Sequence, residues 1–436
     1  MSPNAATVLR PGKESSPGSA PTETGVRLRR WTYPYAAALA ICSDLDETPD
    51  RHVYLRIARF LNTTVTGEMG PGVGLEVGNS IYFDMPPDQF AYWTTDDAGR
   101  AMIHALIRSG HIDVLHSYGD YCGHRDQVAR HLDELRRHEL HLEVWVDHSK
   151  APTNFGPDIM CGRGDVPSAP MYHADLTLNY GIRYVWRGRT TVVTGQDAPA
   201  SPAALANIWT WRHPLVSAQT AAKEAVKVHL GKCGHPRWEM YADNRTYRQS
   251  TLRDGQGIWE FLRSSPFWGG SGRGDTADGI PGVLTEKMLR TLIRRQGACI
   301  LYTHLGKVSD PGRPFGPEAQ AAFRRLARFH HDGRILIRTT QRLLKYLVIR
   351  EHLCFAAACD RGIMRVTIEV VADPVFGTWI PSAGDLQGLT FEMPRCEGVQ
   401  VYSPRGEAVA VEVMHEGQLT RATIPWRPLE FPEERW

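Results

Sequence analysis

The sequence predicts an α/β domain built on parallel strands, followed by a small all-β, sandwich-like domain. From about Ala36 to Leu353, short apolar runs alternate with amphipathic runs of helical spacing. This order of strand, helix and strand is typical of parallel strands joined by crossover helices. From residue 353 onward, short alternating segments are separated by turn residues, which is the pattern of a small β domain.

Each expected element follows from its local pattern. Apolar or alternating runs rich in β-formers predict strands at 36–43, 72–85 (one strand or a hairpin), 114–116, 141–148, 181–188, 298–304 and 334–340. Helical spacing of the apolar side chains predicts helices at 55–62, 96–109, 125–138, 257–263, 285–297, 317–333 and 341–353. The Gly- and Pro-rich stretch 149–170 predicts a long functional loop.

The chain is too long for one ordinary domain. Residues 1–28 are rich in Ser, Pro, Thr, Gly and Ala, and we expect them to form a disordered tail. Residues 29–352 are expected to form the α/β domain, with a long irregular insertion near 190–282. Residues 353–436 are expected to form the β domain.

Composition excludes several classes of protein. The formal net charge of the 436 residues is +2, which gives no electrostatic case for a nucleic-acid partner. The sequence has no run of about 18 or more apolar residues, so we expect no membrane insertion. The first residues lack the apolar core of a signal peptide, and the eight Cys are dispersed with no CxxC pair. These features favour a reducing cytoplasm. The sequence gives no indication of the oligomeric state.

Acidic and imidazole side chains follow several predicted strands, at the ends where ligands bind in α/β folds. Asp44 and Asp46 follow the first strand, and alternation would place both on the same side. His116, His148 and His304 stand at the ends of three further strands. Carboxylates and imidazoles that converge on one rim suit a divalent metal such as zinc. Taken alone, the acidic stretch would also fit a solvated loop or a helix N-cap.

Four segments resemble motifs of the polysaccharide deacetylases, carbohydrate esterases that remove N- or O-acetyl groups from sugars. SDLDE resembles the first motif, which implies that Asp44 is the general base and Asp46 a metal ligand. GHIDVLHSYGD resembles the second motif, in which two His bind the metal. His116 matches the first of them and Asp120 replaces the second, while His124 is a rival ligand one turn further on. A carboxylate can also bind zinc.

The other two segments lie later in the chain. WVDHSKAPTNFG stands where the family has its third motif but lacks the usual Arg, so His148 and Asn154 are substrate-site candidates by position only. LYTHLGK resembles the late motif, which implies that His304 is the general acid. His173, in MYHADL, and Arg245, in the insertion, are further candidates for contact with a substrate.

The resemblance implies both a fold and an activity. The fold is a distorted (β/α) barrel of about seven strands. The activity is that of a hydrolase which uses a divalent metal, in the first instance zinc, and metal-activated water to remove an acetyl group from an amino sugar or glycoconjugate. One alternative is a C–N hydrolase of the same superfamily acting on a cyclic amide or another small molecule. Another is a non-catalytic carbohydrate-binding protein on a decayed barrel, which the replacement at Asp120 would favour.

Overall fold

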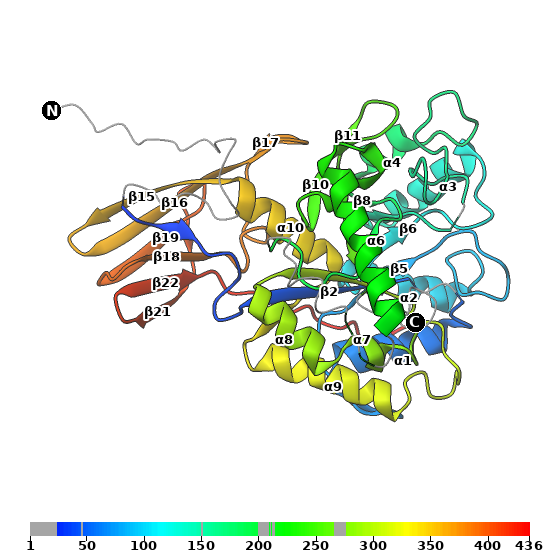
Figure 1. The fold of residues 1–436 in the computed structure, drawn as a ribbon, viewed down its shortest axis with the longest axis horizontal. Coiled ribbons are helices and arrows are strands. Elements are labelled where there is room, and N and C mark those ends of the chain that lie inside the picture. Colours follow the sequence, from blue (N-terminus) through cyan, green and yellow to red (C-terminus); the bar gives the residue numbers. More distant parts are fainter. Residues whose placement is uncertain are drawn as a thin grey trace. The chain divides into compact units, whose positions relative to one another are not determined.

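The computed structural model describes residues 24–44, 47–149, 151–198, 209, 211, 214–265 and 276–436. The chain divides into two compact units, whose elements are labelled in Figure 1. The larger unit consists of residues 37–341 together with 429–436. The smaller unit consists of residues 342–428 together with the segment before residue 37. Most of the predicted tail lies outside the described residues.

The larger unit is a mixed α/β structure organised around one 11-stranded sheet. Its strands are β2 (Ala37–Ser43), β5 (Gly78–Ile81), β6 (Ile112–His116), β7 (Val144–Val146), β8 (Tyr184–Trp186), β9 (Thr190–Thr191), β10 (Tyr247–Thr251), β11 (Gly257–Phe261), β12 (Arg263–Ser264), β13 (Ala298–Thr303) and β14 (Ile335–Ile337). A separate hairpin is formed by β3 (Thr66–Gly67) and β4 (Gly70–Pro71).

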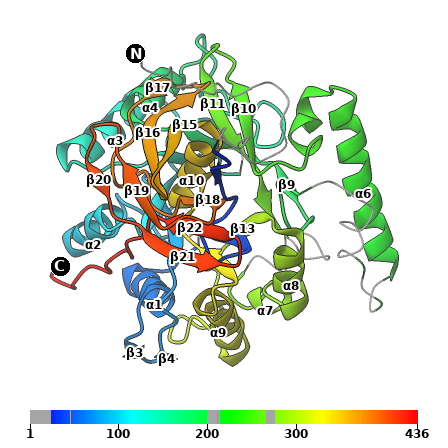
Figure 2. The ribbon, with the colours of Figure 1, turned by 90° about the vertical axis from the view of Figure 1, so that its left-hand side faces the viewer.

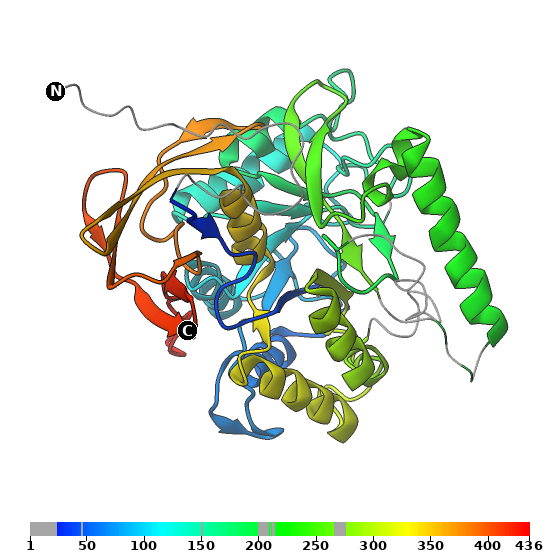
Figure 3. The same ribbon diagram turned by 60° about the vertical axis from the view of Figure 1, so that its left-hand side comes forward.

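The sheet has the order β10-β11-β8-β7-β6-β5-β2-β13-β12-β9, and β14 pairs with β2. Neighbouring strands run parallel except for β10 and β11, so the predicted parallel arrangement is confirmed. Figure 3 shows that the sheet curls as half a barrel. Its pairing among the described residues ends at β10 on one side and at β9 on the other, so a closed barrel is not what the structure shows.

Strand β2 is central because its sequence suits a strand that is covered on both faces. All seven of its residues, AALAICS, are buried. It pairs with β13 along one edge, and with β14 and then β5 along the other. Asp44 follows directly, and its backbone N–H donates to the carbonyl of Thr303 at 2.8 Å. The first acid of SDLDE therefore stands at the C-terminal end of the central strand.

Amphipathic helices cover the sheet, and their buried side chains share one apolar core with it. The principal helices are α1 (Arg51–Asn62), α2 (Asp97–Arg108), α3 (Arg125–Arg137), α8 (Glu286–Arg295) and α9 (Pro317–His331), and all five were predicted. Shorter helices are α4 (Ala174–Tyr180), α7 (Ile280–Val283) and the 3-10 helix η1 (Pro236–Tyr241). Side-chain caps fix some of the starts: Asp50 accepts the N–H groups of His52 and Val53 at the start of α1. Among the described helices, none combines the length and apolar character needed to cross a membrane.

The insertion differs most from the prediction. The helix predicted at 257–263 is wrong, because these residues form β11 and β12; their aromatic and β-branched side chains and their pairing with β8, β10 and β13 override the helical spacing. The described part of the insertion is thus built into the sheet. It also holds an unexpected helix, α6 (Pro214–Lys232), whose buried residues are Ser217, Glu224 and Gly231. Because these buried residues are small or polar, the segment has no helical spacing of apolar side chains from which the helix could have been predicted. Of the strand predicted at 72–85, only β5 is strand.

The smaller unit contains the predicted short strands in two sheets, visible in Figure 2. One sheet has the order β1-β18-β22-β21, and the other has the order β15-β16-β19-β20 with β17 on β16. The strands are β1 (Arg27–Leu28), β15 (Leu353–Asp360), β16 (Ile363–Asp373), β17 (Gly377–Trp379), β18 (Thr390–Pro394), β19 (Gly398–Tyr402), β20 (Ala408–Val409), β21 (Glu412–Glu416) and β22 (Leu419–Thr423). Phe355 of one sheet packs against Phe391 of the other, with ring centroids 5.2 Å apart.

A buried acid on β6 holds the start of α10 (Thr340–His352). The Oδ2 atom of Asp113 accepts the backbone N–H of Gln341 at 2.8 Å. Gly78, on β5, leaves room for this carboxylate, because a Cβ there would stand 1.9 Å from Asp113 Oδ1. Burial raises the pKa of Asp113 to about 7, against the lowering effect of its hydrogen bonds with Gln341 and Thr339.

We expect the gain in the free energy of unfolding that Asp113→Asn gives over the wild type to be larger near pH 8 than near pH 5. A carboxyl group whose pKa is higher in the folded state than in the unfolded state contributes fully to the free energy of unfolding at acidic pH. This contribution is lost as the pH rises through about 7, by up to ~1.4 kcal/mol per pH unit. Asn keeps an acceptor for Gln341 and does not titrate. The neighbouring Cys42 and Tyr54 stay protonated in this range, because burial raises both of their pKa values. Urea unfolding across this pH range provides the measurement, and a wild-type-to-variant difference independent of pH would contradict the expectation.

Candidate active site

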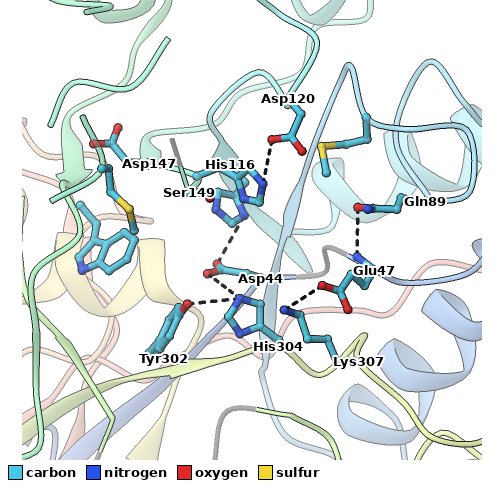
Figure 4. Close-up of a pocket in the computed structure, with 14 residues that line it drawn as sticks. Asp44, Glu47, Gln89, His116, Asp120, Asp147, Ser149, Tyr302, His304 and Lys307 are labelled. Atoms are coloured by element: carbon cyan, nitrogen blue, oxygen red, sulfur yellow. Dashed lines mark hydrogen bonds and ion pairs between the residues drawn. The ribbon is translucent and has the colours of Figure 1, made fainter. Parts of the chain in front are cut away.

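A polar cavity of about 400 Å³ opens at the C-terminal ends of the parallel strands. It is lined by Asp44, Glu47, Met85, Gln89, His116, Asp120, Asp147, His148, Ser149, Met160, Trp186, Tyr302, His304 and Lys307. Most of these residues stand at or just after the ends of β2, β6, β7, β8 and β13, whereas Met85 and Gln89 follow β5 and Met160 lies in the loop after β7. The strand ends therefore converge on one cavity, as predicted. Figure 4 shows the cavity, with Asp44 between His116 and His304.

Asp44 is a buried acid that faces two of the histidines of the cavity, His116 and His304. Its side chain is 2% exposed. Its Oδ1 lies 3.6 Å from Nδ1 of His116, and its Oδ2 lies 3.9 Å from Nε2 of His304. The carboxylate therefore joins two imidazoles that come from strands on opposite sides of β2.

Arg263 is the counter-ion of Asp44. Its Nη1 donates to Asp44 Oδ1 at 3.1 Å, and its Nη2 donates to Oδ2, so the pair is bidentate. The guanidinium contacts two aromatic rings, and its Cζ lies 4.2 Å from the centroid of Trp186 and 4.1 Å from that of Tyr302. Burial lowers the pKa of Arg263, but the charge of Asp44, the hydrogen bond with it, and the nearby Cys42 and Tyr302 together raise this pKa above its usual value. Arg263 is therefore held in the charged form.

His116 is a neutral imidazole fixed from two sides. Its Nδ1 lies 3.4 Å from the hydroxyl of Ser80, and its Nε2 lies 3.5 Å from that of Tyr82. The Tyr82 ring stacks on it at 4.4 Å. Burial, followed by the nearby His148, Arg263 and His304, lowers the pKa of His116 well below its usual value. A neutral ring keeps a lone pair for a proton or a cation.

His148 and Asp120 form a second polar pair at the cavity. Nε2 of His148 lies 3.1 Å from Oδ1 of Asp120, and the Tyr82 hydroxyl lies 3.2 Å from its Nδ1. This hydrogen bond with His148 lowers the pKa of Asp120 below its usual value, so the carboxylate is ionised at neutral pH. Asp120 thus lies beside an imidazole that comes from the next strand.

His304 and Lys307 occupy the other wall. The Tyr302 hydroxyl lies 3.3 Å from His304 Nε2. The turn after β13 is fixed because the backbone N–H of Leu305 donates to Ser43 Oγ at 3.1 Å. Lys307 pairs with Glu47 at 3.2 Å, which places one ammonium group at the rim of an otherwise acidic cavity.

Several candidates from the sequence lie elsewhere. Asn154 is buried, and its amide bonds the backbone of His148 and Met160, so it closes the loop after β7. His173 is buried between Thr177 and the carbonyl of Thr153.

The remaining candidates also lie outside the cavity or the described residues. His124 is exposed at the N-cap of α3, and Arg245 lies over the Tyr247 ring; neither lines the cavity. Asp46 lies outside the described residues. Of the site residues predicted from the sequence, the cavity therefore gathers Asp44, His116, Asp120, His148 and His304.

The donors at the cavity fit a divalent cation in their chemistry. Two imidazoles and a carboxylate, from His116, His148 and Asp120, are the ligand types that zinc takes in catalytic sites. His116 is neutral and Asp120 is ionised, as metal binding requires. Their ligand atoms do not form a group within 4.8 Å of one another, so a cation would draw Asp120, whose side chain is 42% exposed, toward the two rings.

One other cluster has metal-like spacing. Asp84, Cys122 and His131 are the one group of three among the described residues whose ligand atoms lie within 4.8 Å of one another, so this buried cluster could hold an ion. The indole N–H of Trp93, however, donates to His131 Nδ1 at 2.9 Å. The ring proton then sits on Nε2, 2.7 Å from Asp84. While that hydrogen bond lasts, the imidazole has no lone pair for a metal.

The comparisons with known proteins add no assignment to this geometry. No protein-family model matches the chain, and neither a curated protein nor a solved structure matches it. The function of the protein is therefore inferred from the site itself.

Three residues of the site were missed in the sequence. Arg263 lies in a segment predicted to be a helix, and no local pattern marks it as a partner of a residue 219 positions away. Tyr82 and Tyr302 could have been found, because each lies in a segment predicted to be strand, 72–85 and 298–304. Alternation places Tyr82 on the same face as Ser80, toward His116.

Proposed function

We propose that the larger unit is a metal-dependent hydrolase that removes an acetyl or other acyl group from an amino sugar or a similar small molecule. The observation that supports this most is the convergence of Asp44, His116 and His304 on one cavity at the ends of three strands of a parallel sheet. Core packing alone does not require an ionised acid and two imidazoles at corresponding strand ends.

In this proposal Asp44 accepts the proton of the attacking water, and His304 donates a proton to the leaving nitrogen. Arg263 holds the Asp44 carboxylate in place through two hydrogen bonds, one to each oxygen. Tyr302 orients His304. A bound cation would acidify the water and polarise the acyl oxygen.

The size of the cavity favours a small substrate. A volume of about 400 Å³ is near the lower end of the range for ligand sites. It suits one or two rings better than a long stretch of polymer. Acetate release should therefore be measured on soluble acetamido sugars and, in parallel, on cyclic amides, with zinc, with cobalt and with a chelator. Release from the sugars that the chelator stops is the expected result; ring opening of the amides alone would favour the related C–N hydrolase.

We expect His304→Gln to lower kcat for acetamido sugars by about 10²- to 10⁴-fold, because the amine is a poor leaving group without its proton. The loss should be much smaller for an activated aryl acetate, whose leaving group needs no proton. The exposed His124→Gln is the matched control and should leave both rates unchanged. Equal losses on the two substrates would contradict the role of general acid.

A non-catalytic carbohydrate-binding protein is the second candidate. It is favoured by the deep burial of Asp44 and by the engagement of both of its oxygens with Arg263, which also suits a purely structural ion pair. Calorimetric sugar binding without acetate release, at every metal tested, would select this alternative.

A further inference from the structure

We propose that His148 is a ligand of the same divalent cation as His116 and Asp120, so that the imidazole which the second motif lacks is supplied from the end of the next strand. The inference rests on the proposed metal-dependent function. It assigns to His148 a role different from the substrate contact that its sequence position suggested.

The spacing of His148 and Asp120 supports this assignment. Nε2 of His148 and Oδ1 of Asp120 lie 3.1 Å apart. Two ligand atoms that each lie about 2.0–2.2 Å from a tetrahedral zinc ion are separated by a little more than this. Both side chains line the cavity that holds His116. The two rings, His116 and His148, are neighbours, with centroids 4.9 Å apart.

The orientation of the His148 ring also supports it. A metal-bound imidazole usually directs one nitrogen to the ion and the other to a second polar group that fixes the ring. Here Nε2 faces Asp120, and Nδ1 lies 3.2 Å from the Tyr82 hydroxyl. A hydroxyl can accept as well as donate, so Nδ1 can carry the ring proton and leave the Nε2 lone pair for an ion. This differs from His131, because the indole N–H of Trp93 can only donate. The Tyr82 hydroxyl also lies 3.5 Å from His116 Nε2, so Tyr82 contacts both rings.

The backbone of His148 is fixed as well. Its N–H donates to Asn154 Oδ1 at 2.9 Å, and its carbonyl accepts from Asn154 Nδ2 at 3.1 Å. Asp147, the preceding residue, is buried and accepts the N–H groups of Phe155 and Gly156. A ligand that must stay within a few tenths of an ångström of an ion needs such support. Asn154 is in this account a positioning residue for His148.

The exposure of the pair fits a site that an ion can enter. The His148 side chain is 12% exposed and that of Asp120 is 42% exposed. His116, at 2% exposed, forms the floor. The competing interpretation is an ordinary ion pair between His148 and Asp120, which would be indifferent to metal.

Metal binding itself separates these interpretations. The full-length chain is freed of metal and titrated with Co(II), with affinity and the visible ligand-field spectrum as readouts. We expect one Co(II) per chain, and a loss of affinity of about 100-fold or more in His148→Gln and in Asp120→Asn, with an altered spectrum. Tyr82→Phe, which removes only the hydroxyl, should lose about 10-fold. His124→Gln is the control and tests the rival ligand; it should match the wild type. Circular dichroism confirms that each variant is folded.

Each outcome decides one statement. Wild-type binding that His148→Gln leaves intact overturns the assignment of His148 and leaves the proposed hydrolase standing. If the wild type binds no cobalt but still releases acetate, the metal part of the function and the inference both fail. A folded His148→Gln with weaker cobalt binding supports the inference whatever the substrate is.

Discussion

Asp44→Asn is expected to lower kcat/KM for deacetylation by about 10²- to 10⁴-fold, which corresponds to about 3–5 kcal/mol of transition-state stabilisation. The substitution keeps the size and shape of the side chain but removes its ability to take a proton. Since Asp44 is the acid that lies between His116 and His304, no other described carboxylate in the cavity occupies an equivalent place. Initial rates of acetate release at saturating cation provide the measurement.

Stability and catalysis must be separated in this experiment, because Asn leaves Arg263 without its counter-ion. Asp113→Asn is a matched control, since it also removes a buried carboxyl group, here on β6, but lies outside the cavity. It should retain the wild-type rate. If a folded Asp44→Asn kept a rate within a few-fold of the wild type, Asp44 could not be the base.

The parts of the fold that depend on local pattern were predictable from the sequence. The apolar run before Asp44 marks a strand that is buried on both faces, and the amphipathic periods mark the helices that cover the sheet. Parallel strands bring their C-terminal ends to one edge, so His116, His148 and His304 could be expected near Asp44 before any coordinates existed.

The parts that depend on long-range pairing were not predictable in this way. Residues 257–264 have helical spacing, but strand partners far away in sequence make them β11 and β12. The same pairing delivers Arg263 to Asp44. His173 and Asn154 carry groups that could do chemistry, but hydrogen bonds to the backbone use those groups, and one sequence does not distinguish a satisfied polar residue from a functional one.

Arg263→Met is expected to destabilise the larger unit by about 3–5 kcal/mol, the largest stability effect we predict, because it leaves the carboxylate of Asp44 buried without a counter-charge. Met can still pack against the rings of Trp186 and Tyr302, so packing loss contributes little to this figure. Urea unfolding of the larger unit, followed by tryptophan fluorescence, gives the free energy.

The double variant Asp44→Leu with Arg263→Met is the decisive partner to that measurement. Replacing both members of a buried ion pair with apolar side chains is often neutral, so we expect most of the lost stability to return while the hydrolytic activity does not. If the double variant is as unstable as Arg263→Met, the loss comes from packing rather than from the unpaired charge. If it is stable and still hydrolyses acetamido sugars, the pair is purely structural. A double variant that is stable but inactive is the expected result. It would indicate that the ion pair serves catalysis at some cost to stability.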